Sequence, residues 1–166
     1  MLPDKAGSAD GLILLGLGES FLPALRKMLE DAQFFKDFTG EEISVLANYV
    51  GAYEAKQGTW IFREGSRSSF MCLLVQGRVD IIKESAKKIS TIRAGKTMGE
   101  MSIIDGFPYS ASALAVEDST LVYITRHDFN KLSEENAQVA VRFYRQIARL
   151  MSLRLRQTTG ALVDYL

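Results

Sequence analysis

The chain has 166 residues, of which 47% are hydrophobic and 24% are charged. These proportions match the averages for soluble globular proteins and exclude a chain that is disordered throughout. Twenty basic and twenty acidic residues give a formal net charge of zero, which argues against a nucleic-acid binder with a basic surface. The single cysteine, Cys72, and the single histidine, His127, exclude an internal disulfide framework and a multi-histidine metal centre.

The same composition favours a reducing, cytoplasmic compartment. The most apolar early segment, residues 12–17, is far shorter than the ~20 residues of a membrane-spanning helix, so no membrane association is expected. With one histidine and no nucleophile motif, the sequence does not predict an enzyme, and it predicts no cofactor.

Residues 1–33 are predicted to form an N-terminal extension with one helix. Leucines recur there at helical spacing between Phe21 and Asp31. A second helix is predicted to begin at Thr39, because Thr39 and Glu42 have the spacing of a capping box. Gly51 is a suitable stop for this helix.

Residues 34–133 are predicted to form a β-barrel. Short runs rich in β-branched and aromatic residues alternate with glycines, as in closed barrels and jelly rolls. The segment 70–81, with Gln76-Gly77 at its turn, predicts a β-hairpin. Further strands are predicted around Ile89 and Ile92, from Ser110 to Val116 and from Leu121 to Thr125. The predicted fold class is mainly β with flanking helices: a double-stranded β-helix (jelly-roll) barrel with N-terminal helices and a long C-terminal helix.

Residues 134–166 are predicted to form that C-terminal helix and a tail, with Ser133 as the N-cap. A three-four spacing joins Ala140, Phe143, Ile147, Leu150 and Arg154, with Tyr144, Ala148, Met151 and Leu155 beside them. The apolar face that results is broad. The helix is longer than a small barrel needs for covering. A homodimer is therefore predicted through this helix, centred on Phe143, Ile147, Leu150 and Met151.

Arginines also recur along the same helix. Arg142, Arg145, Arg149 and Arg156 share one stripe, with Arg154 nearby. Two interpretations stay open: a solvated helix face, which we favour, or a contact with an anion, including a basic lid over a phosphate pocket.

The most specific segment for function is 94–111. Gly99 permits a close backbone approach, and the residues after it can form one helical turn whose first N–H groups point back towards Gly99. Glu100 can accept a hydrogen bond from a sugar hydroxyl. Pro108 stiffens the return into the next strand. The pattern indicates a binding site for a small anionic ligand.

Three stretches carry a resemblance to a known family: Ile61–Gly65 followed by Leu73–Val79, then Gly95–Glu100, then Pro108–Ala111. They resemble the cyclic-nucleotide-binding domains of catabolite activator protein, protein kinase A regulatory subunits and gated channels. The resemblance implies a regulatory module that senses cyclic AMP, cyclic GMP or a related small anionic ligand. It also implies the ligand-binding residues, which are Gly99, Glu100, Met101, Ser102, Tyr109, Ser110 and Ala111.

One position departs from the family pattern. Members that bind a cyclic nucleotide usually have arginine directly after the proline, where it pairs with the phosphate, and this chain has Tyr109. A charge-assisted hydrogen bond is worth ~1.5–3 kcal/mol, so its loss predicts binding weaker by roughly ten- to a few-hundred-fold. Tyr109 either lines an altered pocket or fills the space of the arginine and closes the site.

Two alternatives follow from this departure. In the first, the chain is a ligand-free scaffold or dimerisation module of the same fold. In the second, it is a partner subunit in transcriptional regulation. Transcription factors of this family continue past the long helix with a helix-turn-helix domain. Residues 158–166 are too few for one, so direct DNA binding is not expected.

Overall fold

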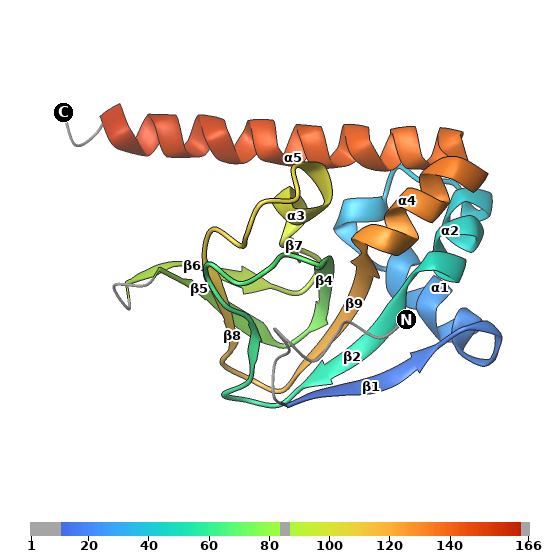
Figure 1. Cartoon of the computed structure of the whole chain (residues 1–166), viewed down its shortest axis with the longest axis horizontal. Helices are drawn as coiled ribbons and strands as arrows, with labels where there is room; N and C mark the ends of the chain where they lie inside the picture. The colour runs from blue at the N-terminus through green and yellow to red at the C-terminus, as the bar shows by residue number, and fades with distance from the viewer. Residues whose placement is uncertain (1–10, 84–86, 164–166) are drawn as a thin grey trace.

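The computed structural model describes residues 11–83 and 87–163, which form two sheets beneath a long helix (Figure 1). Residues 1–10 of the predicted extension and 164–166 of the predicted tail lie outside the described residues. The first sheet has the order β1 (Leu12–Leu17), β2 (Gly51–Ala55), β9 (Ser119–Thr125), β4 (Phe70–Gln76) and β7 (Thr97–Met98). The second has the order β3 (Trp60–Phe62), β8 (Ser112–Ala115), β5 (Arg78–Ile82) and β6 (Lys88–Arg93). The predicted jelly-roll barrel with flanking helices is confirmed.

Strand β4 is almost continuously apolar because both of its faces are covered. Alternate residues of a strand point to opposite sides of the sheet. Phe70, Cys72 and Leu74 belong to the core between the two sheets. Met71 and Leu73 belong to a second core, beneath the helices.

The predicted hairpin at residues 70–81 is wrong. Strand β4 pairs with β7 and β9, whereas β5 pairs with β6 and β8, so the two strands lie in different sheets. Gly77 connects them with φ +98°, and a Cβ atom there would lie 2.3 Å from the Oγ of Ser119. Glycine therefore allows the chain to pass from one sheet to the other, instead of turning back along the same sheet.

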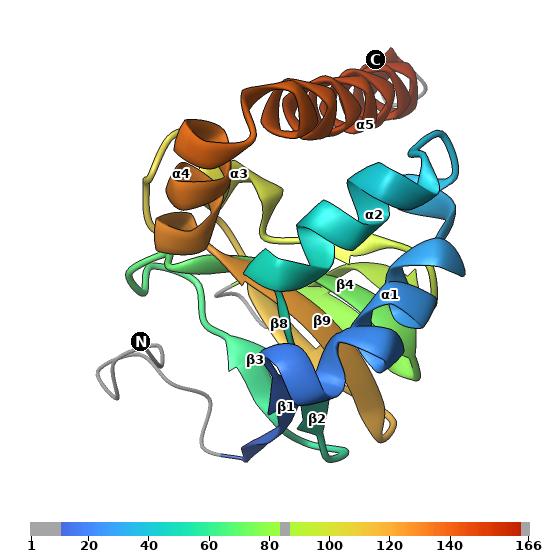
Figure 2. The same cartoon turned by 90° about the vertical axis from the view of Figure 1, so that its right-hand side faces the viewer.

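The N-terminal extension contains a strand that the sequence analysis did not predict. Besides the expected helix α1 (Leu22–Glu30), strand β1 pairs antiparallel with β2 at the edge of the first sheet. Helix α2 (Gly40–Leu46) begins with the predicted capping box, which is confirmed at Thr39 and Glu42. Figure 2 shows α1 and α2 lying over strands β4 and β9.

Two helices follow the last strand, α4 (Arg126–Glu135) and α5 (Ala137–Val163). The predicted N-cap at Ser133 is wrong, because Ser133 lies inside α4 and its hydroxyl donates to the carbonyl oxygen of Phe129. The side chain of Thr125 caps α4 instead. Short 3-10 helices complete the chain: η1 (Glu19–Phe21), η2 (Gln33–Phe35) and η3 (Ala47–Tyr49).

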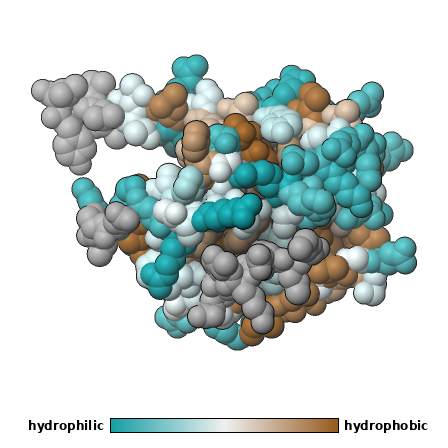
Figure 3. All heavy atoms as spheres, in the orientation of Figure 1, coloured by the Kyte–Doolittle hydropathy of each residue, from teal (hydrophilic) through white to brown (hydrophobic). Residues whose placement is uncertain are grey.

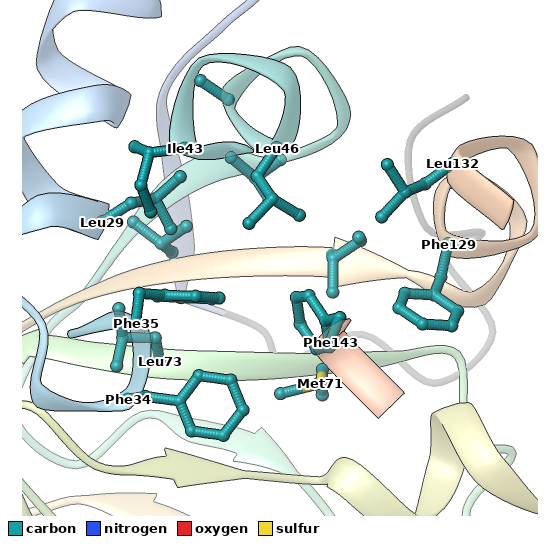
Figure 4. Close-up of a cluster of buried hydrophobic side chains, with 14 of the residues drawn as sticks. Leu29, Phe34, Phe35, Ile43, Leu46, Met71, Leu73, Phe129, Leu132 and Phe143 are labelled. Atoms are coloured by element: carbon teal, nitrogen blue, oxygen red, sulfur yellow. The ribbon is translucent and has the colours of Figure 1, made fainter. Parts of the chain in front are cut away.

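The core beneath the helices involves α1, α2, α4, α5 and the outer face of the first sheet (Figure 4). Its largest fully buried side chains are Leu25, Leu29, Ile43, Leu46, Phe129, Leu132, Phe143 and Ile147. Phe143 and Ile147 thus pack inside their own chain. The prediction that they form the centre of a dimer contact is wrong, because the barrel and its helices already cover this face of α5.

Candidate functional site

A cavity of about 210 Å³ lies among the second sheet, the segment after β7 and α5. Six of the seven predicted site residues line it: Gly99, Glu100, Met101, Tyr109, Ser110 and Ala111. Ser102 lies on α3 (Glu100–Ile104), and its side chain is outside the described part of the structure. The remaining lining side chains are mainly apolar and include Phe62, Ile81, Ile92, Met98 and Phe107.

Gly99 brings the backbone close to strand β4, as predicted. It has φ +77° and is the N-cap of α3. A Cβ atom at this position would lie 3.1 Å from the carbonyl oxygen of Phe70. The positive φ and the close approach both favour glycine. The tight passage places Glu100, the next residue, at the wall of the cavity.

Glu100 is a buried carboxylate with polar partners on both oxygens. Its residue is 3% exposed. The hydroxyl of Thr97 donates to Oε1, and Nη1 of Arg154 donates to Oε2 at 2.9 Å. Nη2 of Arg154 also donates to the carbonyl oxygen of Thr97 at 2.8 Å. A buried carboxylate needs such partners, so α5 helps to hold Glu100 in place.

Tyr109 lines the cavity and also packs in the core between the two sheets. Its ring stacks on Phe62 with a centroid distance of 4.1 Å and an interplanar angle of 9°. Its hydroxyl donates to the carbonyl oxygen of Phe70 at 2.7 Å and accepts from the N–H of Phe70 at 3.2 Å. Burial raises the pKa of Tyr109 to about 12. The hydroxyl is therefore bonded within the barrel core, although the residue lines the cavity.

The sequence model of the cyclic nucleotide-binding domain matches residues 53–136 of this chain. The chain belongs to the cyclic nucleotide-binding domain family. The segment that forms the cavity wall, from Thr97 to Ala111, lies within the matched residues.

Individual members of the family are similar over much of the chain. The cyclic AMP receptor protein of Thermus thermophilus is 28% identical over 133 residues, which are 78% of this chain and 60% of that protein. A cGMP-dependent protein kinase of Caenorhabditis briggsae is 28% identical over 115 residues, 67% of this chain and 15% of the kinase. This chain therefore spans less than two thirds of either relative. The crystal structure of a cyclic nucleotide-binding domain from Methylobacillus flagellatus has a TM-score of 0.80 at 24% identity and covers 93% of this chain and 89% of its own.

Arg154 is the site residue that the sequence analysis missed in this cyclic nucleotide-binding domain. The analysis placed it on the apolar face of the C-terminal helix and near the arginine stripe, but not among the ligand-binding residues. One signal was available, because Arg154 continues the three-four spacing of Phe143, Ile147 and Leu150. An arginine on the inward face of a helix points towards the domain, where it needs an acidic partner.

The other arginines of the stripe fit the solvated-face interpretation where the structure shows their partners. Arg142 bonds to Glu42 through Nη1 at 2.6 and 2.8 Å, and Arg149 lies 4.0 Å from Asp37. Both join α5 to the N-terminal helical region at the surface.

Other candidate groups for chemistry are accounted for. Cys72 is buried in the barrel, and burial raises the pKa of its thiol, as expected of an inert core cysteine. Within the described ranges, no group of three or more histidine, cysteine or acidic side chains lies close enough together to hold a metal ion. Likewise, no helix in this part of the chain has the length and hydrophobicity needed to cross a bilayer.

Proposed function

We propose that this domain is a regulatory module whose cavity binds a cyclic mononucleotide, cyclic AMP or cyclic GMP, with low affinity. The observation that carries the proposal is the buried carboxylate of Glu100 at the cavity wall, directly after the close approach at Gly99. A carboxylate has several acceptor positions, so Glu100 can take a ribose hydroxyl in addition to its present partners. Apolar side chains around it can cover the base.

The low affinity follows from Tyr109. Its hydroxyl is already bonded to the backbone of Phe70, so it offers nothing to a phosphate. Without the usual cassette arginine we expect binding weaker by roughly ten- to a few-hundred-fold.

Thermal denaturation with increasing cyclic AMP or cyclic GMP tests this proposal. A ligand that binds only the folded state adds about 2.7 kcal/mol of stability at one hundred times its dissociation constant. We expect Glu100→Gln to weaken the shift about ten-fold in ligand concentration, and the exposed Glu134→Gln on α4 to leave it unchanged. If millimolar nucleotide produces no shift in the wild type, the proposal is wrong.

That negative result would favour a ligand-free scaffold. One observation supports this second candidate: Arg154 and Thr97 already bond to both oxygens of Glu100. Arg154 then satisfies the Glu100 carboxylate in the position where a ligand hydroxyl would otherwise bind it. In that case Glu100→Gln would reduce stability and no nucleotide would restore it.

We also propose a homodimer through α5, centred on the exposed edge of the predicted apolar face and not on the buried side chains of Phe143 and Ile147. Side chains at alternating spacings of three and four residues form an outer stripe: Val141, Tyr144, Ala148, Met151 and Leu155. Of these, Met151 is half-buried and also packs against the core beneath the helices. Val141 is 57% exposed and Leu155 is 68% exposed. This heptad spacing suits a second copy of the same helix. Figure 3 shows apolar side chains gathered at several points along the edge where α5 lies.

The remaining expectations are proposals of the same kind. We infer that the domain acts by ligand binding and self-association, and not by catalysis or by direct contact with DNA. The zero net charge supports the absence of direct DNA contact, since domains that bind DNA commonly carry a basic surface overall. A mobility-shift assay with random-sequence DNA at low salt would test it.

A further inference from the structure

The proposed cyclic nucleotide brings a negative phosphate into a cavity whose own charges cancel. Among the described residues that line the cavity, Glu100 carries the one negative charge and Arg154 the one positive charge. An anion that enters such an apolar cavity loses part of its hydration and needs a charged or hydrogen-bonding partner there. Tyr109 cannot be that partner, because its hydroxyl is bonded to Phe70.

Arg154 is a positively charged side chain at the cavity wall. It extends from α5 to the cavity, and its guanidinium is held by Glu100 at 2.9 Å and by the carbonyl oxygen of Thr97 at 2.8 Å. These two bonds use only part of the donor set of a guanidinium group. Its side chain is 39% exposed, so it is held in place without being enclosed.

A second cation lies nearby but has a different orientation. Lys83 donates to the carbonyl oxygen of Ser110 at 2.8 Å and also pairs with Glu64. Unlike Arg154, Lys83 does not line the cavity. Ser110 therefore lines the cavity, while its carbonyl oxygen accepts from Lys83.

We infer that Arg154, supplied by the C-terminal helix, is the phosphate-binding cation of this domain. Because two of its donors stay bonded to Glu100 and to the carbonyl oxygen of Thr97, it replaces the cassette arginine only in part, and the affinity stays low. The inference rests on the proposed binding of a cyclic mononucleotide. It adds a specific consequence: the phosphate contacts α5 itself, so ligand binding and the docking of the C-terminal part of α5 stabilise each other. Figure 1 shows α5 passing over α3, and Arg154 of α5 donates to Glu100 of α3.

The test compares a charged and an uncharged ligand. Cyclic AMP carries the phosphate, and adenosine has the same base and ribose without it. We expect Arg154→Gln to weaken cyclic AMP binding by roughly ten- to a hundred-fold and to change adenosine binding by less than about two-fold. The matched control is Arg156→Gln, which removes an exposed arginine two residues further along α5 and is expected to change neither affinity.

Two further measurements keep the inference falsifiable if Arg154→Gln is unstable. Arg154→Lys retains the charge without the forked donors and is expected to bind cyclic AMP with intermediate affinity. In the wild type, raising the salt concentration from about 50 to about 500 mM is expected to weaken cyclic AMP but not adenosine.

Each result has one meaning. Equal weakening of both ligands by Arg154→Gln overturns the inference, because the arginine would then act by holding Glu100. Tighter cyclic AMP binding in the variant also overturns it, because Arg154 would then be a competitor for Glu100. If the wild type binds adenosine and cyclic AMP equally well, Arg154 does not read the phosphate. If the wild type binds neither ligand, the proposed function fails and the inference fails with it.

Discussion

Tyr109→Phe separates the structural role of this tyrosine from a role in ligand binding. The substitution keeps the ring that stacks on Phe62 and removes only the hydroxyl. That hydroxyl makes two hydrogen bonds to the backbone of Phe70, at 2.7 and 3.2 Å. A net contribution of about 1 kcal/mol per buried hydrogen bond predicts a loss of about 1–3 kcal/mol in the free energy of unfolding.

The same variant is expected to bind the ligand as the wild type does. Urea unfolding followed by the fluorescence of Trp60, the single tryptophan, measures the stability. Calorimetric titration with cyclic AMP measures the affinity. A variant as stable as the wild type, or one whose affinity changes ten-fold, would refute the assignment of the hydroxyl to the barrel core.

The pH dependence of the free energy of unfolding provides a second comparison of the wild type with Tyr109→Phe. Burial raises the pKa of Tyr109 from 10.0 to about 12. In the unfolded chain the phenol loses its proton near pH 10, whereas in the folded chain it keeps the proton until about pH 12. Between these values the folded state binds more protons, so stability falls as the pH rises.

At about 1.4 kcal/mol per pKa unit, this group contributes a loss on the order of 3 kcal/mol between pH 10 and 12. Tyr109→Phe lacks that loss. We therefore expect the stability difference between the two proteins to narrow steadily above pH 10. A constant difference across this range would show that the phenol is not buried as the structure has it.

Four other predictions test the fold and the dimer. We expect Leu155→Asp to split the homodimer in sedimentation experiments while the barrel stays folded, because its side chain is 68% exposed. Ile147→Asp is expected to unfold the chain, since an unpaired charge in a buried position costs several kcal/mol; a folded monomer in this variant would contradict the packing of α5. Gly77→Ala is expected to cost at least about 2 kcal/mol more than Gly58→Ala, because both have positive φ but only Gly77 has backbone and side-chain atoms within 3 Å of a Cβ. Thr39→Ala is expected to cost about 1 kcal/mol through loss of the N-cap of α2, and an unchanged urea midpoint would contradict it.

The parts of the fold that depend on local sequence were predictable. The capping box at Thr39 and the strand-rich region follow from residue types at short spacing. The pairing of strands does not. Strands β4 and β5 follow one another through Gly77 in the manner of a hairpin, yet β4 pairs with β9, about fifty residues further on. Local turn chemistry cannot choose between these partners, because the choice depends on packing between the two sheets.

Strand β1 was missed for a related reason. Its sequence, Leu12–Leu17, is a short apolar run without alternation, which fits a buried strand, a helix segment or a loose lead equally well. Pairing with β2 decides the outcome, and β2 is more than thirty residues away. The predicted start of the long helix at Ser133 was wrong because serine occurs both at N-caps and within helices. Within a helix its hydroxyl can bond to the carbonyl oxygen of the preceding turn, as Ser133 does.

The candidate site also has a part that was predictable from local sequence and a part that was not. Gly99, Glu100 and Tyr109 lie on one continuous segment, so a single motif identified them together. Arg154 is 54 residues beyond Glu100, and no local pattern joins the two. The long helix brings them together because the buried stripe that ends at Arg154 fixes which side of α5 faces the barrel.

Placing the phosphate-binding arginine on α5, and not on the segment after Pro108, has a consequence for signalling. A phosphate cation on the cassette would bind ligand whether or not α5 is docked. Arg154 reaches the cavity only when α5 is docked on the barrel. A ligand whose phosphate is bound by Arg154 therefore requires the docked helix. Since the outer stripe of the same helix is the proposed dimer contact, ligand, helix position and dimer are linked in one equilibrium. By reciprocity, Leu155→Asp should then lower cyclic AMP affinity without touching the cavity, and equal affinity in monomer and dimer would show that the two faces of α5 are independent.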